Sequence, residues 1–116
     1  MWPNAAANCP LVSRRRIRDH PDLVVQIIRT HINATDYANA HTRETAAIYA
    51  NRIEDNLSTI EYSIRTWDGE WISDPHVEIP SALEYATVDY QLNYTSRQLS
   101  EGGLFNTSLY DKVRTT

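Results

Sequence analysis

Cysteine, glycine and long apolar runs are scarce in this sequence of 116 residues. Cys9 is the only cysteine, which excludes an internal disulfide and suits a reducing compartment. Three glycines are too few for a phosphate-binding loop, and there is no G-x-S-x-G nucleophile elbow. No histidines or cysteines pair at metal-ligand spacing, and no apolar run is long enough to span a bilayer. We therefore expect no enzyme, no metal, no cofactor and no membrane partner.

Positive charge is concentrated near the N-terminus. Residues 1–20 contain four arginines and one aspartate, a net charge of +3, so the remainder of this chain of net charge -4 has -7. The four residues of this basic arm are Arg14, Arg15, Arg16 and Arg18. Between Glu54 and Asp89, nine carboxylates face a single cation, Arg65. The acidic part repels nucleic acid, whereas the arm could bind nucleic acid, bind a partner protein or remain solvated.

Residues 21–103 have the pattern of a helical domain. Pro21 suits the first turn of a helix, and the apolar spacing that follows predicts a short helix to about Ile32. Asn33, Thr35 and Asp36 are capping residues, so a second, alanine-rich helix is expected from about residue 36 or 42 to residue 57.

Residues 46–67 allow two interpretations. Apolar residues in steps of four and three predict a continuous coiled-coil stripe, whereas the alternation from Ile60 to Thr66 is typical of a strand. Asp68-Gly69 suits a type I′ turn, which favours a β-hairpin from about Thr59 to Ser73. The expected fold is mainly α with one β-hairpin, an α+β class.

A third helix is expected from about Pro80 to Ser100, ended by Gly102-Gly103. It is apolar on two opposite sides, so one side could contact another subunit. We favour Val88, Leu92 and Leu99 for the core. The predicted subunit-interface residues, including the exposed member of a tryptophan pair, are Leu83, Tyr90, Tyr94 and Trp71.

The C-terminal tail, residues 104–116, has apolar residues at near-helical spacing. It is too short to be a stable helix alone in water, so its apolar stripe needs a surface, either its own core or a partner. The candidate docking residues are Leu104, Phe105, Leu109, Tyr110 and Val113.

The order of these segments resembles the head–tail connector (adaptor) proteins of tailed bacteriophages, over about residues 21–116. The stretches that carry the resemblance include "THINATD" and "AAIYANRIEDNL", whose Ile53-Glu54 pair is similar to the end of a helix in that family. "SIRTWDG" looks like the strand that follows there, "IPSALEYATVDY" is similar to a later helix and "SLYDKVR" to the closing segment.

The resemblance implies a structural protein of the virion neck, made in the host cytoplasm. Such a protein forms a ring on the portal, carries the tail or a stopper protein, and lets DNA pass without specific binding. The resemblance implies no catalysis and no cofactor. Two other functions also fit the charge pattern: a small nucleic-acid-binding or regulatory protein that uses the arginine arm, and an acidic inhibitor that mimics DNA.

Overall fold

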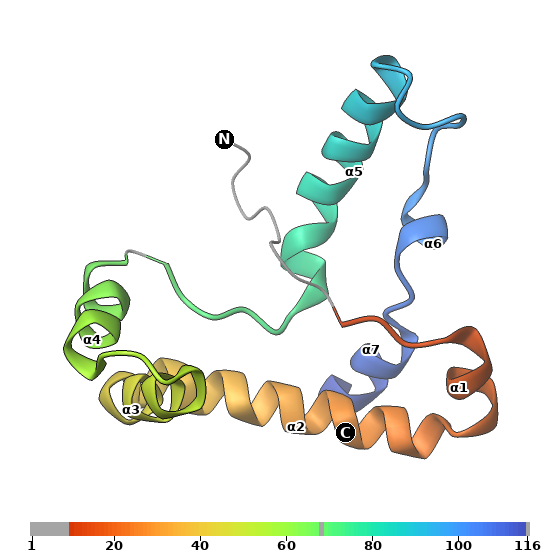
Figure 1. The fold of residues 1–116 in the computed structure, drawn as a ribbon. Coiled ribbons are helices and arrows are strands. Elements are labelled where there is room, and N and C mark those ends of the chain that lie inside the picture. Colours follow the sequence, from red (N-terminus) through yellow and green to blue (C-terminus); the bar gives the residue numbers. More distant parts are fainter. Residues whose placement is uncertain (1–9, 68, 116) are drawn as a thin grey trace. The chain divides into compact units, whose positions relative to one another are not determined.

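The computed structural model describes residues 10–67 and 69–115, and every regular element in these ranges is a helix (Figure 1). The helices are α1 (Arg14–Asp19), α2 (Pro21–Ala40), α3 (Thr42–Ile53), α4 (Leu57–Thr66), α5 (Pro75–Gln91), α6 (Glu101–Leu104) and α7 (Ser108–Thr115).

The predicted β-hairpin is wrong, and with it the α+β class and the strand-like interpretation of "SIRTWDG". Helix α4 occupies most of its first half, and the described residues of its second half contain no strand. Ile60 and Ile64 are half-buried one helical turn apart, while Tyr62 between them is exposed. Alternation over so few residues therefore fitted a helix as well as a strand. Gly69 lacks the positive φ of a type I′ turn, and Asp68 lies outside the described residues.

The hydroxyl groups of α4 explain why β-branched and polar residues are tolerated in this helix. Ser63 Oγ donates to the carbonyl oxygen of Thr59 at 3.0 Å, and Thr66 Oγ1 donates to that of Tyr62 at 2.7 Å. The side chain of Asn56 caps the helix by accepting from the backbone N–H groups of residues 58 and 59. These local bonds satisfy polar groups that would otherwise compete with the helical backbone.

Helix α2 is longer than expected and α3 is shorter. The proposed capping residues 33–36 lie inside α2, where Thr35 Oγ1 donates to the carbonyl oxygen of His31 at 2.8 Å. Helix α3 ends at Ile53 because Glu54 adopts the left-handed conformation, with φ 56° and ψ 44°. A short turn then reverses the chain, and α3 and α4 pack side by side (Figure 1).

Helix α5 begins and ends earlier than expected. Asp74 caps its N-terminus by accepting from the backbone N–H of His76, and Pro75 follows at the first helical position. At the other end, Asn93 has φ 61°, which stops the helix well before the glycines that were expected to end it. Those glycines lie in the single turn α6.

The chain forms two compact units, and it passes from one to the other twice, within α2 after Ile28 and again after Ser73. One unit combines the chain up to Ile28 with the chain from Asp74 onward, and the other is Arg29–Ser73. Among the described residues, few apolar side chains are buried in either unit. They are Val24, Ile79, Ala86 and Tyr110 in the first unit, and Ile32, Ala46 and Ala50 in the second.

Candidate functional site

Helix α1 contains the four arginines of the predicted arm. Ser13 caps this helix by accepting from the backbone N–H of Arg16 at 3.1 Å, so the basic residues project from a folded element. Arg18 pairs with Asp19 at 2.8 Å and Arg15 lies 3.6 Å from the same carboxylate. The hydrogen bond from Arg18 Nε to the Asp19 carboxylate raises the pKa of Arg18, which remains charged at any physiological pH.

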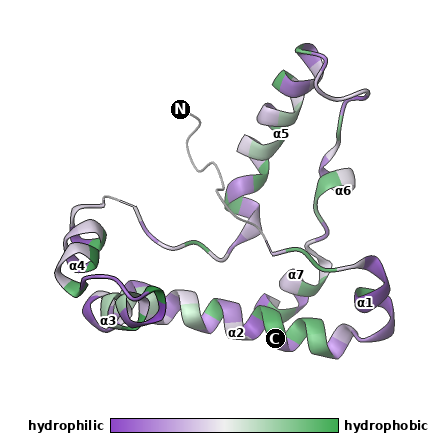
Figure 2. Cartoon of the chain, viewed as in Figure 1, coloured by the Kyte–Doolittle hydropathy of each residue, from purple (hydrophilic) through white to green (hydrophobic). Residues whose placement is uncertain are grey.

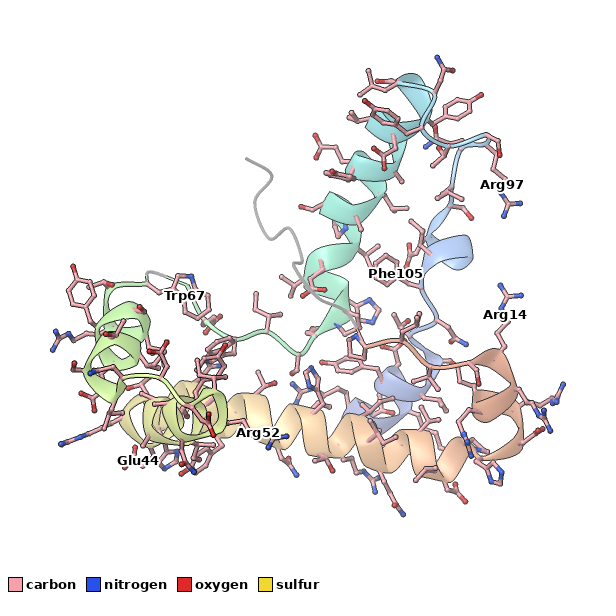
Figure 3. All side chains as sticks on the ribbon, in the orientation of Figure 1. Arg14, Glu44, Arg52, Trp67, Arg97 and Phe105 are labelled. Carbon is pink, nitrogen blue, oxygen red and sulfur yellow. The ribbon has the colours of Figure 1, made fainter. Side chains whose placement is uncertain are left out.

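In the described part of the chain, Asp19 is the one carboxylate that pairs with the arginines of α1, and Arg14 extends away from the ribbon (Figure 3). The helix is mostly hydrophilic, in contrast to the apolar first half of α2 that follows it (Figure 2). Ile17 is its one half-buried residue. The arrangement can present several guanidinium groups to an anionic surface.

The C-terminal half of α5 has apolar side chains on two sides. Ala86 is buried and Leu83 is half-buried on one side. On the other side, Tyr85 is 54% exposed and Leu92 is 57% exposed, with half-buried Val88 between them. A helix with a buried side and an exposed apolar side has a surface available for a second contact.

The predicted interface residues on α5 and just beyond it differ in how far they are buried. Tyr90 and Tyr94 are both exposed, Tyr94 by 77%. Leu83 is half-buried within its own unit. Leu99, expected in the core with Val88 and Leu92, lies beyond the end of the helix and is half-buried. The exposure of the two tyrosines is compatible with an interface, which remains a prediction.

Trp71 lies in the segment between α4 and α5. Its ring contacts that of Trp67 edge to face at a centroid distance of 5.0 Å, and both rings are exposed. The side-chain amide of Asn39 on α2 fixes the backbone of Trp71 by two hydrogen bonds, of 2.8 and 2.9 Å. The Trp67 indole also covers Gly69 so closely that an added Cβ would lie 2.5 Å from the ring. The tryptophans are therefore held in place although neither is buried.

The candidate docking residues of the tail do not share one environment. Tyr110 is buried at 8% exposure, and Leu109 and Val113 are half-buried in α7. Leu104 is exposed on α6, and Phe105 is half-buried after it. The burial of Tyr110 favours a role in the protein's own core for that residue, while docking on a partner remains a prediction for the others.

A histidine–carboxylate contact fixes the tail to α5. His76 Nε2 donates to Asp111 Oδ1 at 2.6 Å, and Thr107 Oγ1 donates to the other carboxylate oxygen at 3.0 Å. The hydrogen bond to Asp111 raises the pKa of His76, and the negative charges of Asp111, Asp74 and Glu101 add to this effect. The same bond lowers the pKa of Asp111.

Sequence reasoning missed the contacts of Asn39 and His76. Their partners lie 32 and 35 residues away in the chain, beyond the range of any periodic pattern. Only the Asp74-Pro75 cap at the start of α5 offered a local signal, which could have placed His76 in a first helical turn.

No group of three or more metal-ligating side chains occurs in residues 10–67 and 69–115, and no helix there has the length and apolarity to cross a bilayer.

A hollow of about 390 Å³ beside α3 and α4 is lined by Arg43, Glu44, Ala47, Leu57 and Glu61. Arg43 and Glu61 form an exposed ion pair across 3.7 Å.

No protein-family model, curated protein or solved structure matches the chain.

Proposed function

We propose that this protein is a structural adaptor of a tailed-phage neck, which assembles as a ring between the portal and a tail or stopper protein. The observation that carries the proposal is the balance of buried and exposed apolar side chains. Among the described residues, seven apolar side chains are buried, three of them alanines, while eighteen large ones are exposed. A protein that works as an isolated monomer rarely exposes so much apolar surface relative to its core.

Two further features support an assembly role. The exposed apolar residues occur on both compact units, including Ile48 and Tyr62 in one and Tyr85 and Leu92 in the other. A subunit of a ring needs two different surfaces, one for each neighbour. Residues 21–116 have a net charge of -7, so a channel formed by them would not retain DNA phosphates.

The test is assembly of the purified protein with portal rings from a tailed phage. We expect ring-sized particles in sedimentation and electron microscopy, with the protein bound to the portal. Tyr94→Glu should prevent assembly while leaving the monomer folded, because Tyr94 is 77% exposed. Ser96→Glu, which adds the same charge at a nearby exposed polar position, is the matched control.

A wild-type protein that stays monomeric at concentrations of about 1 mM, both alone and with portal rings, would contradict the proposal. Equal assembly of the Tyr94→Glu variant would instead show that the predicted interface is misplaced, without affecting the assembly role.

A further inference from the structure

The exposed side of α5 has a continuous apolar stripe. Tyr85, Val88 and Leu92 follow one another at spacings of three and four residues, so they form one stripe. Glu84 and Asp89 flank this stripe on its two edges. An apolar centre bordered by charged residues is the usual composition of a helix face that contacts another protein.

The charge at this end of α5 is unbalanced. The last turn contains Asp89 and no basic residue, and the C-terminus of any helix has a partial negative charge of its own. A cation near this end would therefore stabilise it. No lysine or arginine lies between Arg65 and Arg97 in the sequence.

Helix α1 has the opposite imbalance. Its first turn contains Arg14, Arg15 and Arg16 and no acidic residue, although the N-terminus of a helix favours negative charge. Arg14, Arg15 and Arg18 lie within about 100° of each other around the helix. Leu11, just before the helix, is 97% exposed. This surface combines guanidinium groups with one fully solvated apolar side chain.

We infer that the stripe of Tyr85, Val88 and Leu92 on α5 binds the segment Leu11–Arg18 of a second copy of the protein. The arginines of that copy pair with Glu84 and Asp89, their aliphatic stems cover the stripe, and one guanidinium lies over the ring of Tyr85. Charge complementarity selects a second copy, because each chain presents one surface of each sign. The inference rests on the proposed assembly function and specifies its subunit contact.

The contact is heterologous, because two different surfaces meet. Such contacts repeat head to tail and close into a ring if the rotation between neighbours allows it. Each copy then keeps one basic and one acidic surface until its two neighbours are in place.

Charge reversal tests the contact. The first variant is Arg14→Glu with Arg15→Glu, and the second is Glu84→Lys with Asp89→Lys. Three of these four changes improve the match between side-chain charge and helix dipole. Glu84 is exposed and Asp89 is half-buried in the last turn of α5, where a lysine can reach water, so both variants should fold. Each should self-associate at least about tenfold more weakly than the wild type in sedimentation velocity, because like charges then meet.

Restored assembly on combining the two charge reversals would distinguish a direct contact between the surfaces from a general effect of net charge. A protein with all four changes has the wild-type net charge and swapped surfaces, so it should assemble again, as should an equimolar mixture of the two variants. Arg29→Glu with Arg52→Glu is the control, because it makes the same charge change on exposed residues of α2 and α3. The control should assemble normally.

Three outcomes would overturn the inference. If either variant assembles like the wild type, the contact lies elsewhere and the adaptor proposal stands. If the four-change protein and the mixture stay monomeric while circular dichroism shows them folded, α1 and α5 do not meet. If the wild type itself is monomeric under all conditions, the inference and the adaptor proposal both fail.

Discussion

The α3–α4 pair and the α5–α7 contact show two different ways of joining helices in one small chain. The first pair is adjacent in sequence, is joined by a three-residue turn and buries alanines. The second joins residues about 35 positions apart through one buried tyrosine and one histidine–carboxylate bond. Close packing of small residues distributes the stabilisation over many atoms, whereas the tail depends on a few identifiable groups. Single substitutions should therefore affect the tail more than the helical pair.

The largest effect is expected from Tyr110→Ala. It removes the only described side chain of the tail that is almost fully buried, together with the phenol oxygen that accepts from Arg114 Nε at 3.0 Å. We expect a loss of about 3 kcal/mol in the free energy of unfolding, measured by urea denaturation. Tyr94→Ala, at an exposed position, should change it by less than about 0.5 kcal/mol. A neutral Tyr110→Ala would mean that α7 is not held by its own core.

Overpacking tests the α3–α4 pair. Ala46 is fully buried, so Ala46→Leu has no space and should destabilise the protein by about 2 kcal/mol. Ala47→Leu, one residue along the same helix on its exposed side, is the control and should be nearly neutral. If the two variants melt at the same temperature, the two helices are not closely packed.

A smaller effect, of opposite sign, is expected at the turn between α3 and α4. Glu54 has a left-handed backbone conformation that favours glycine. Glu54→Gly should therefore stabilise the protein by about 0.5–1 kcal/mol in thermal unfolding. Glu44→Gly, within α3, should destabilise it by a similar amount because glycine is unfavourable inside a helix. Destabilisation by Glu54→Gly would show that the turn is not strained.

The smallest effect is the pH dependence of the tail. The pKa of His76 is raised above its ordinary 6.5, so its contribution is complete below that pH and is lost as the pH rises through the raised pKa. The pKa of Asp111 is lowered below 3.8, so its contribution is present above that value and is lost as the pH falls through the lowered pKa.

Hydrogen exchange of the α7 amides should therefore be slowest between about pH 4 and 6.5, after correction for the intrinsic exchange rate. The neutral imidazole can still donate to Asp111 at higher pH, so the change should be modest. His76→Gln should remove the dependence, whereas His31→Gln on α2 should keep it. An unchanged profile in His76→Gln would exclude this contact as the cause.

Much of the helical character could be predicted from sequence, and the errors have identifiable physical causes. Pro21 and the apolar spacing after it correctly placed the start of α2. The strand prediction is wrong because Ile60 and Ile64 fit both periods, and because the side chain of Asn56 caps a helix at the start of this segment. The end of α5 was misplaced because Asn93, which tolerates positive φ, gives a weaker signal than glycine.

The candidate surfaces were less predictable than the helices. Charge composition located the arginines of α1 without showing that they project from a capped helix. Two-sided apolarity of α5 was visible in the sequence, but the pattern could not show that Tyr85 and Leu92 would be exposed. Burial depends on contacts between distant segments, such as that between His76 and Asp111, which no local period encodes.

The two hydrogen bonds between Asn39 and Trp71 make the side chain of an asparagine behave like a peptide group. A carboxamide can present one of its two N–H donors and its C=O acceptor side by side in the same plane, as the backbone of a neighbouring strand would. Trp71 thus receives the pairing of a β-ladder from a single residue of a helix. Aspartate at position 39 would have the same shape but no donor, so its carboxylate would face the carbonyl oxygen of Trp71. Position 39 therefore favours asparagine over aspartate, although the two side chains differ only in an NH₂ group in place of an oxygen atom.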